Sequence, residues 1–176
     1  MELIGRMMDG SFDYDRGGRL EPVSGGPGAR QEDKIERLRE VPLFEECSTK
    51  QLRSLAKITD VFDVPAGALI ARAGEPGDEF FLISDGSARV DVSPDQHVLL
   101  GPGKFFGEMS LLDGGPRSAT VVANTPVRLF VIRRRNFSVL LNDVPGLIHT
   151  LLVTLSRRVR QAEERAERLA AGATRT

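Results

Sequence analysis

Residues able to hold a small anion gather between Phe106 and Thr120. Gly107 and Glu108 open a short apolar turn, and Arg117 follows a Gly-Gly-Pro bend just before a β-branched run. A glycine lets the backbone approach a ligand closely, and a single helical turn leaves N–H groups without intrahelical partners. A guanidinium matches two phosphate oxygens. These residue types in this order predict a pocket for a sugar phosphate.

The residues of this stretch have different expected roles. Gly107, Met109 and Ser110 are candidates for the main-chain cradle of the phosphate, with Arg117 as its fixed cation. Glu108 would repel a phosphate, but its carboxylate suits a hydrogen bond from a ribose hydroxyl, as acidic residues do in other nucleotide sites. The alternative for Glu108 and Arg117 is a structural ion pair between the turn and the strand.

Helix and strand patterns surround this stretch. One short helix is expected from about Glu32, and a second begins at the capping box of Ser48. Short strands separated by turn residues follow, and their spacing indicates a sandwich or barrel. They are Val61–Val64, Ala68–Arg72, Glu79–Ser84, Ser87–Val92, His97–Leu100, Ala119–Ala123 and Val127–Ile132. Two more helices are expected, Arg133–Asn142 and a longer one that starts at Pro145.

The Phe106–Thr120 stretch resembles the phosphate-binding cassette of the cyclic nucleotide-binding domain family, roughly Phe-Gly-Glu-x-x-Leu and then Pro-Arg-x-Ala-Thr. The upstream pattern agrees in order: Pro65-Ala66-Gly67, Ile70, Gly74, Gly77-Asp78, Phe80-Phe81, Ile83 and Gly86. The resemblance covers roughly Lys34 to Arg160. It implies a mainly β fold with flanking α-helices. The expected core is a double-stranded β-helix, or jelly-roll-like β-roll, at 61–132, with N-terminal helices before it and two C-terminal helices at 133–170.

The resemblance also implies the ligand, a cyclic nucleotide, and further contacts to it. Ser118 would lie against the cyclic phosphate or the purine. Serine and alanine at this position are commoner among cyclic AMP binders in the family, whereas threonine is associated with cyclic GMP, so cyclic AMP is favoured. Two strands across the roll and the last helix supply the candidates for the base: Val90, His97, Val98, Leu151 and Leu155. Ordinary core packing and, for the leucines, a helix-to-helix dimer seam are the alternatives.

Composition limits the other possibilities. The chain has 176 residues, about one domain, and a formal net charge of -1, which argues against a generally basic nucleic-acid surface. Residues 1–30 are expected to be flexible, residues 31–160 to form the domain, and residues 171–176 to be a disordered tail. No signal peptide and no apolar run of about 20 residues is evident. A cytoplasmic protein without a membrane span is therefore expected.

Catalysis is not expected. The only histidines, His97 and His149, belong to different elements, and no nucleophile with a base at recognisable spacing is present. No metal or other cofactor is therefore expected. Arg157 and Arg158 are offset by nearby glutamates, and a solvated helix face is the expected place for them.

The leading hypothesis is a non-enzymatic cyclic nucleotide receptor or sensor module. It would relay ligand binding through its C-terminal helices to an unknown effector protein in trans, and a homodimer through the last helix is a further hypothesis. Two helices use up the residues after the last strand, so neither a helix-turn-helix nor a nucleic-acid partner is expected. The alternatives are an oligomerisation or scaffold module with a vestigial pocket, and a truncated Crp/Fnr-type transcription regulator.

Overall fold

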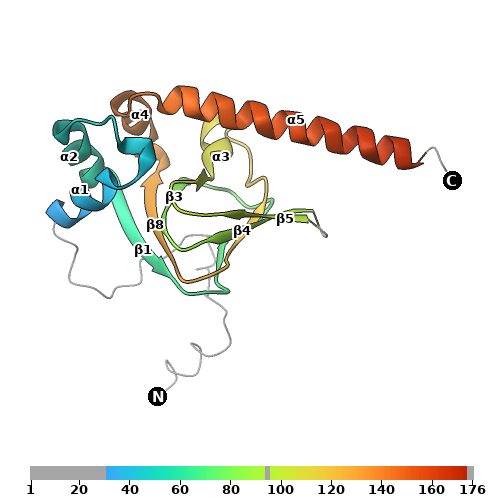
Figure 1. Ribbon diagram of the computed structural model, residues 1–176, viewed down its shortest axis with the longest axis horizontal. Helices are drawn as coiled ribbons and strands as arrows, with labels where there is room; N and C mark the ends of the chain where they lie inside the picture. Colours follow the sequence, from blue (N-terminus) through green and yellow to red (C-terminus); the bar gives the residue numbers. More distant parts are fainter. Residues whose placement is uncertain (1–30, 94–95, 174–176) are drawn as a thin grey trace, which may run out of the picture.

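Helices flank two small sheets in the described part of the chain. The structure is a computed structural model that describes residues 31–93 and 96–173. Its helical elements are α1 (Gln31–Arg39), the short turn η2 (Pro42–Phe44), α2 (Thr49–Ile58), α3 (Glu108–Asp113), α4 (Arg134–Asp143) and α5 (Leu147–Ala173). Its strands are β1 (Thr59–Val64), β2 (Leu69–Ala71), β3 (Glu79–Asp85), β4 (Ala88–Ser93), β5 (Gln96–Leu100), β6 (Phe105–Phe106), β7 (Thr120–Ala123) and β8 (Val127–Arg133). Figure 1 shows α1 and α2 at one end of the strands and α5 along one side.

The strands form a roll of two four-stranded sheets. Their orders are β1-β8-β3-β6 and β2-β7-β4-β5, and neighbouring strands run antiparallel. This mainly β roll with flanking helices confirms the fold class that the sequence predicted. Every predicted strand is present, and each of its ends lies within two residues of the prediction. The sequence did not predict β6, because a strand of two residues is too short to show an alternation of side chains.

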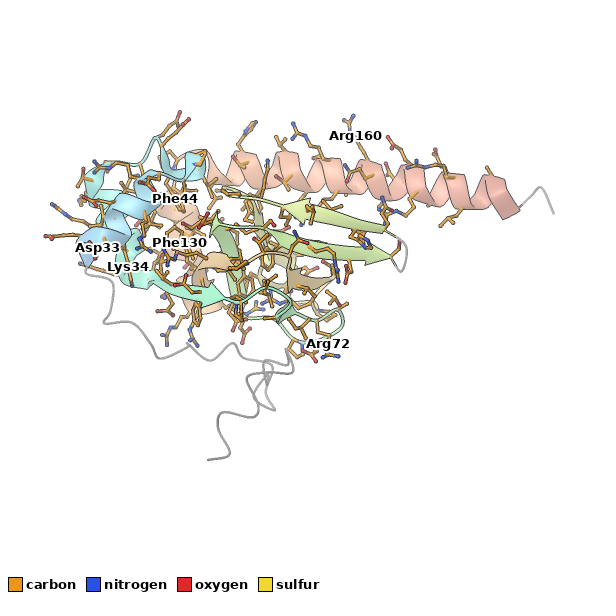
Figure 2. The ribbon with its side chains drawn as sticks, turned by 60° about the horizontal axis from the view of Figure 1, so that its bottom comes forward. Asp33, Lys34, Phe44, Arg72, Phe130 and Arg160 are labelled. Carbon is orange, nitrogen blue, oxygen red and sulfur yellow. The ribbon has the colours of Figure 1, made fainter. Side chains whose placement is uncertain are left out.

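Two apolar clusters stabilise the roll and its helices. The first lies between the β1-β8-β3-β6 sheet and helices α1, α2, α4 and α5, and it includes Phe44, Phe80 and Phe130. Phe44 and Phe130 are labelled where these helices meet the strands in Figure 2. The second cluster fills the roll, where the rings of Phe81 and Phe106 stack with their centroids 4.8 Å apart. Because successive side chains of a strand point to opposite faces, β3 contributes to both clusters.

The predicted start of α2 is confirmed. Ser48 caps α2 with a complete capping box, in which its hydroxyl accepts from the Gln51 N–H and the Gln51 side chain accepts from the Ser48 N–H. Lys34 of α1 donates to the carbonyl oxygen of Thr59 at 2.8 Å, just past the end of α2. A cation there is favourable because the last carbonyls of a helix lack intrahelical partners. The two N-terminal helices are thus joined before the roll begins.

Helix α5 is the longest element. It starts at Leu147, two residues later than predicted, and Leu147 and Leu151 are buried in the first cluster. Figure 1 shows α5 running over α3 and the β4–β5 hairpin and ending beyond the strands. The disordered tail predicted for residues 171–176 is wrong for its first part, because α5 continues to Ala173 through an alanine-rich segment that favours helix. Residues 1–30 and 174–176 lie outside the described residues.

Within residues 31–93 and 96–173, no single helix is long and apolar enough to cross a bilayer. The pair α4 and α5 passes the same length and composition test only when both are taken together, across a bend of 110°.

Candidate functional site

A cavity of about 480 Å³ lies between the β2-β7-β4-β5 sheet, the start of α3 and the distal part of α5. It brings together all the residues predicted to hold the phosphate and the ribose, namely Gly107, Glu108, Met109, Ser110, Arg117 and Ser118. A volume of this size is within the range of small-molecule sites. The cavity is therefore the candidate functional site.

Arg117 supplies a buried cation to this cavity. It is only 7% exposed, and its guanidinium lies 5.2 Å from the centroid of the Phe81 ring. Its Nη1 donates to the carbonyl oxygens of Glu79 at 2.9 Å and Gly107 at 3.1 Å, and its Nη2 donates to the Glu79 carboxylate at 2.9 Å. These contacts come from two separate segments of chain, β3 and the residue just before α3. They fix the cation at the cavity wall, and the proposed role of Arg117 as phosphate ligand requires such a fixed cation.

Two glycines let the backbone pack closely around this guanidinium. A Cβ added to Gly77 would lie 2.1 Å from the Arg117 Nε, and one added to Gly107 would lie 2.6 Å from Nη1 and 2.7 Å from the Glu79 carbonyl oxygen. Gly107 also has a φ of 85°, in the left-handed region that residues with a Cβ rarely adopt. Both positions need glycine because any side chain would displace Arg117.

Glu108 lines the same cavity. It is fully buried, and its Oε1 accepts a hydrogen bond from Nη1 of Arg158, which α5 carries to it. Its Oε2 is buried and has no hydrogen-bond partner among the described residues. Burial raises the pKa of the Glu108 carboxyl group, although the Arg158 charge opposes this shift. A buried acceptor without a partner is costly, so a ligand hydroxyl at this position would gain a strong hydrogen bond.

The structure pairs the two buried acids with other arginines than the ion pair considered as an alternative in the sequence analysis. That alternative paired Glu108 with Arg117, whereas the structure pairs Arg117 with Glu79 and Glu108 with Arg158. Arg158 was expected on a solvated helix face, and that expectation is wrong because α5 turns this residue into the cavity. The signal in the sequence was its spacing: Arg158, Gln161 and Arg165 share one face of α5, and all three line the cavity.

An apolar slot forms the wall opposite the arginines. Val90 and Val98, which pair across β4 and β5, line it as predicted, together with Val92 and Leu100. His97 does not line the cavity; its Nδ1 lies 3.7 Å from a carboxylate oxygen of Asp91. Because side chains alternate along a strand, only one parity of β5 can face the cavity, and His97 has the other parity.

Helix α5 covers the cavity with residues nearer its C-terminus than the predicted Leu151 and Leu155. Leu151 is buried in the first apolar cluster, and neither Leu151 nor Leu155 lines the cavity. The lining residues of α5 begin at Arg158, because the first turns of the helix are packed against α4 and the sheet. In Figure 2, Arg160 projects from the outer side of α5, away from the strands.

The cavity is linked to the C-terminal helices by Arg134, the first residue of α4. Its Nη2 donates to the carbonyl oxygens of Ser110 in α3 and Gly77 beside Arg117, both at 3.0 Å. Its Nε donates to the Asp78 carboxylate at 2.8 Å. A movement of α3 would therefore displace the Arg134 side chain at the start of α4. No pattern in the sequence indicates this contact beyond the residue type itself.

Metal chemistry finds no support in the described part of the chain, where no three His, Cys, Asp or Glu side chains gather in a way that could hold an ion. The cavity instead combines a fixed guanidinium, a carboxylate oxygen without a partner, and an apolar slot. A β-roll with such a cavity defines a binding domain for a small ligand that carries an anion, hydroxyl groups and an apolar ring.

Comparison with known proteins agrees with this class. Residues 61–143 match the sequence profile of the cyclic nucleotide-binding domain. This segment, which runs from β1 to the end of α4, therefore has the sequence of a cyclic nucleotide-binding domain.

Relatives of several kinds share this domain. The chain is 42% identical over 118 residues to a cyclic nucleotide-gated potassium channel of Mesorhizobium japonicum, an alignment that covers 67% of this chain and 33% of the channel. It is 36% identical over 104 residues to the cyclic AMP receptor protein of Thermus thermophilus, covering 56% of this chain and 48% of the receptor. The regulatory domain of Toxoplasma gondii PKA, crystallised with cAMP, superimposes with a TM-score of 0.62 at 25% identity, covering 73% of this chain and 50% of that one. The alignments thus span between a third and a half of these proteins.

Proposed function

We propose that the protein is a cyclic nucleotide receptor or sensor module. The observation that carries this proposal is the cavity in which the buried Arg117 guanidinium and the partnerless Oε2 of Glu108 occur together. The cyclic phosphate would accept hydrogen bonds from Arg117 and from main-chain N–H groups at the start of α3, and the ribose 2′-hydroxyl would donate to Glu108. The purine would lie in the slot of Val90 and Val98.

Cyclic AMP is the proposed ligand in preference to cyclic GMP. Ser118 lines the cavity, and of the compared proteins one is named a cyclic AMP receptor protein and another was crystallised with cAMP. Arg158, Gln161 and Arg165 of α5 lie on the side of the cavity opposite the slot and are the side chains available to cover the base. They replace His97, Leu151 and Leu155 as the proposed base contacts.

The proposed output is a movement of the C-terminal helices that an effector protein in trans would sense. Two contacts support this path: Arg158 joins α5 to Glu108, and Arg134 joins α4 to the carbonyl oxygen of Ser110. A ligand hydroxyl that donates to Oε2 of Glu108 would lie beside Arg158, which donates to Oε1, so a bound ligand would favour one position of α5 over another. A ligand shifts such an equilibrium by its difference in affinity for the two positions.

Thermal melts with cyclic AMP and with cyclic GMP test the proposal. At about 100 times its dissociation constant, a ligand that binds only the folded state adds about 2.7 kcal/mol to the free energy of unfolding. We expect a rise in Tm with cyclic AMP and a smaller rise with cyclic GMP at the same concentration. A scaffold with a vestigial pocket would show no rise with either nucleotide.

A homodimer through α5 is the proposed assembly. Four large apolar side chains of α5 are more than half exposed: Ile148 at 55%, Leu152 at 59%, Val159 at 56% and Leu169 at 70%. With Leu155, Ala162 and Ala166 between them, they form a stripe whose spacing alternates between four and three residues, as in a coiled-coil seam. A second copy of the same helix is the partner that such a stripe fits.

Sedimentation equilibrium tests this assembly. We expect a dimer for the natural chain at micromolar concentration and a monomer for Val159→Glu, because a charge inside the seam would be buried without a partner. Arg160→Glu, at a position off the stripe, is the matched control and should leave the dimer intact. A natural chain that remains a monomer would contradict the proposed seam.

A further inference from the structure

Behind the Arg117 guanidinium lies a buried charge, Glu79, that the proposed ligand contacts do not use. Glu79 is buried, and its side-chain Oε2 accepts from Arg117 Nη2 at 2.9 Å while its main-chain oxygen accepts from Arg117 Nη1 at 2.9 Å. The main-chain N–H of Asp78 also donates to Oε2, at 3.2 Å. Glu79 does not line the cavity, whereas Arg117 does. The carboxylate therefore lies behind the guanidinium as seen from a bound phosphate.

This arrangement changes how the site responds to the charge of a ligand. An isolated buried guanidinium would attract a dianionic phosphate about twice as strongly as a monoanionic one, because the Coulomb energy is proportional to the charge. With a carboxylate directly behind it, each added negative charge on the ligand is attracted by Arg117 and repelled by Glu79 from only a little farther away. The pair is almost completely shielded from water, with side-chain exposures of 6% and 11%, so salt screens it weakly.

A second carboxylate adds to the effect. Glu108 lines the same cavity, and its charge is balanced by Arg158 from α5. Each of the two buried acids is thus paired with one arginine, and the other arginines that line the cavity, Arg165 and Arg168, lie farther along α5. Hydrogen-bond geometry at Arg117, rather than net attraction, then decides the affinity, and a second negative charge on the phosphate gains little there.

We infer that Glu79 is a specificity-determining residue that makes the site select the monoanionic cyclic phosphate over the dianionic phosphate monoester of the same nucleoside. It acts through Arg117, which it both orients and partly neutralises. The inference rests on the proposed function, since it concerns the same cavity. Its biological meaning is rejection of 5′-AMP, the product of opening the cyclic phosphate.

Calorimetric titration with three adenosine ligands separates ring closure from charge. The ligands are cyclic AMP, adenosine 5′-methyl phosphate, which is open but monoanionic, and 5′-AMP, which at pH 8 is a dianion because its second pKa is about 6. For the natural protein we expect adenosine 5′-methyl phosphate to bind about tenfold more tightly than 5′-AMP despite its extra methyl group. This measurement needs no variant. Equal or tighter binding of 5′-AMP would overturn the inference.

Glu79→Gln then tests the residue itself. The amide oxygen of glutamine can still accept from Arg117 and from the Asp78 N–H, so the orientation of Arg117 is kept while the charge is removed. We expect the preference for the methyl ester over 5′-AMP to shrink by about tenfold or to reverse. Asp85→Asn, at the exposed far end of β3, changes the net charge equally and should leave the preference unchanged.

The outcomes distinguish this inference from the proposed function. A natural protein that binds cyclic AMP, together with a Glu79→Gln variant that binds it with an unchanged preference between the open ligands, would overturn the inference alone. A natural protein that binds none of the three ligands would overturn both. A reduced preference in Glu79→Gln but not in Asp85→Asn supports the assignment of Glu79.

Discussion

Arg117→Ala is expected to weaken cyclic AMP binding by about 2–5 kcal/mol, because it removes one partner of a buried charge pair between protein and ligand. That range corresponds to a loss of affinity between about thirtyfold and several thousandfold. Isothermal titration of the natural protein and the variant measures it. The large effect is expected because Arg117 is 7% exposed and is fixed by Glu79, Gly107 and Phe81, so its charge is already aligned for a ligand.

Stability must be separated from affinity in this experiment. Arg117→Ala also leaves the Glu79 carboxylate buried without its partner, which typically costs about 3–5 kcal/mol of stability. The double variant Glu79→Gln, Arg117→Gln replaces the ion pair by two amides and should recover most of that stability while cyclic AMP binding stays weak. Recovery of binding as well would show that Arg117 is structural and not a ligand.

Gly77→Ala tests the position of the same guanidinium without removing its charge. Gly77→Ala would place a methyl group 2.1 Å from the Arg117 Nε, so the guanidinium must move although its charge remains. Gly101→Ala is the matched control, since nothing lies within 4 Å of the added atom and neither glycine has a left-handed φ. Weaker binding in Gly77→Ala, with normal binding in Gly101→Ala, would support the position of Arg117 seen in the structure.

Glu108→Gln is expected to change stability and affinity in opposite directions. A hydrogen bond from the ribose to a carboxylate contributes about 1 kcal/mol more than one to a neutral amide, so cyclic AMP affinity should fall several-fold to about tenfold. The free energy of unfolding at neutral pH should rise, because the variant no longer buries an ionised group. Arg158, whose side chain is 37% exposed, can turn to solvent when its partner is neutral.

The pH dependence of stability gives an independent check on Glu108. Burial raises the pKa of this group above its ordinary value of 4.5, so in the window between the two values the folded protein binds a proton that the unfolded chain has released. Stability from this group is fully present below the ordinary value and is lost as the pH rises through the raised folded-state pKa. Urea unfolding of the natural protein from pH 4.5 to 8 should show this loss, and Glu108→Gln should not.

A matched control lies in the same short helix. Asp113→Asn removes an exposed charge at the other end of α3 and keeps the oxygen that accepts from the Gly115 N–H. It should leave both the pH profile and the affinity as in the natural protein. A Glu108→Gln variant that loses stability at neutral pH would contradict the account of Glu108, since the Arg158 contact would then outweigh the cost of burial.

The sequence by itself determined the cassette and the roll. The residues from Gly107 to Ser118 are consecutive or nearly so, and the turn and strand that position them follow from their own residue types. The period-two pattern of the strands is equally local, and the strand ends differ from the prediction by at most two residues. Local patterns were enough to locate these elements, whereas their closure into a roll was implied by the family resemblance.

Only the tertiary structure decided which groups surround the ligand position. Glu79 and Arg158 are 38 and 50 residues from the side chains that they pair with, so no local pattern indicates either pairing. The parity of β5, which turns Val98 inward and His97 outward, depends on its register with β4. The 110° bend between α4 and α5 determines which turn of α5 reaches the cavity, and this places Arg158 there while Leu151 stays in the core. Such choices depend on how whole elements pack, and packing is decided by contacts between residues far apart in the chain.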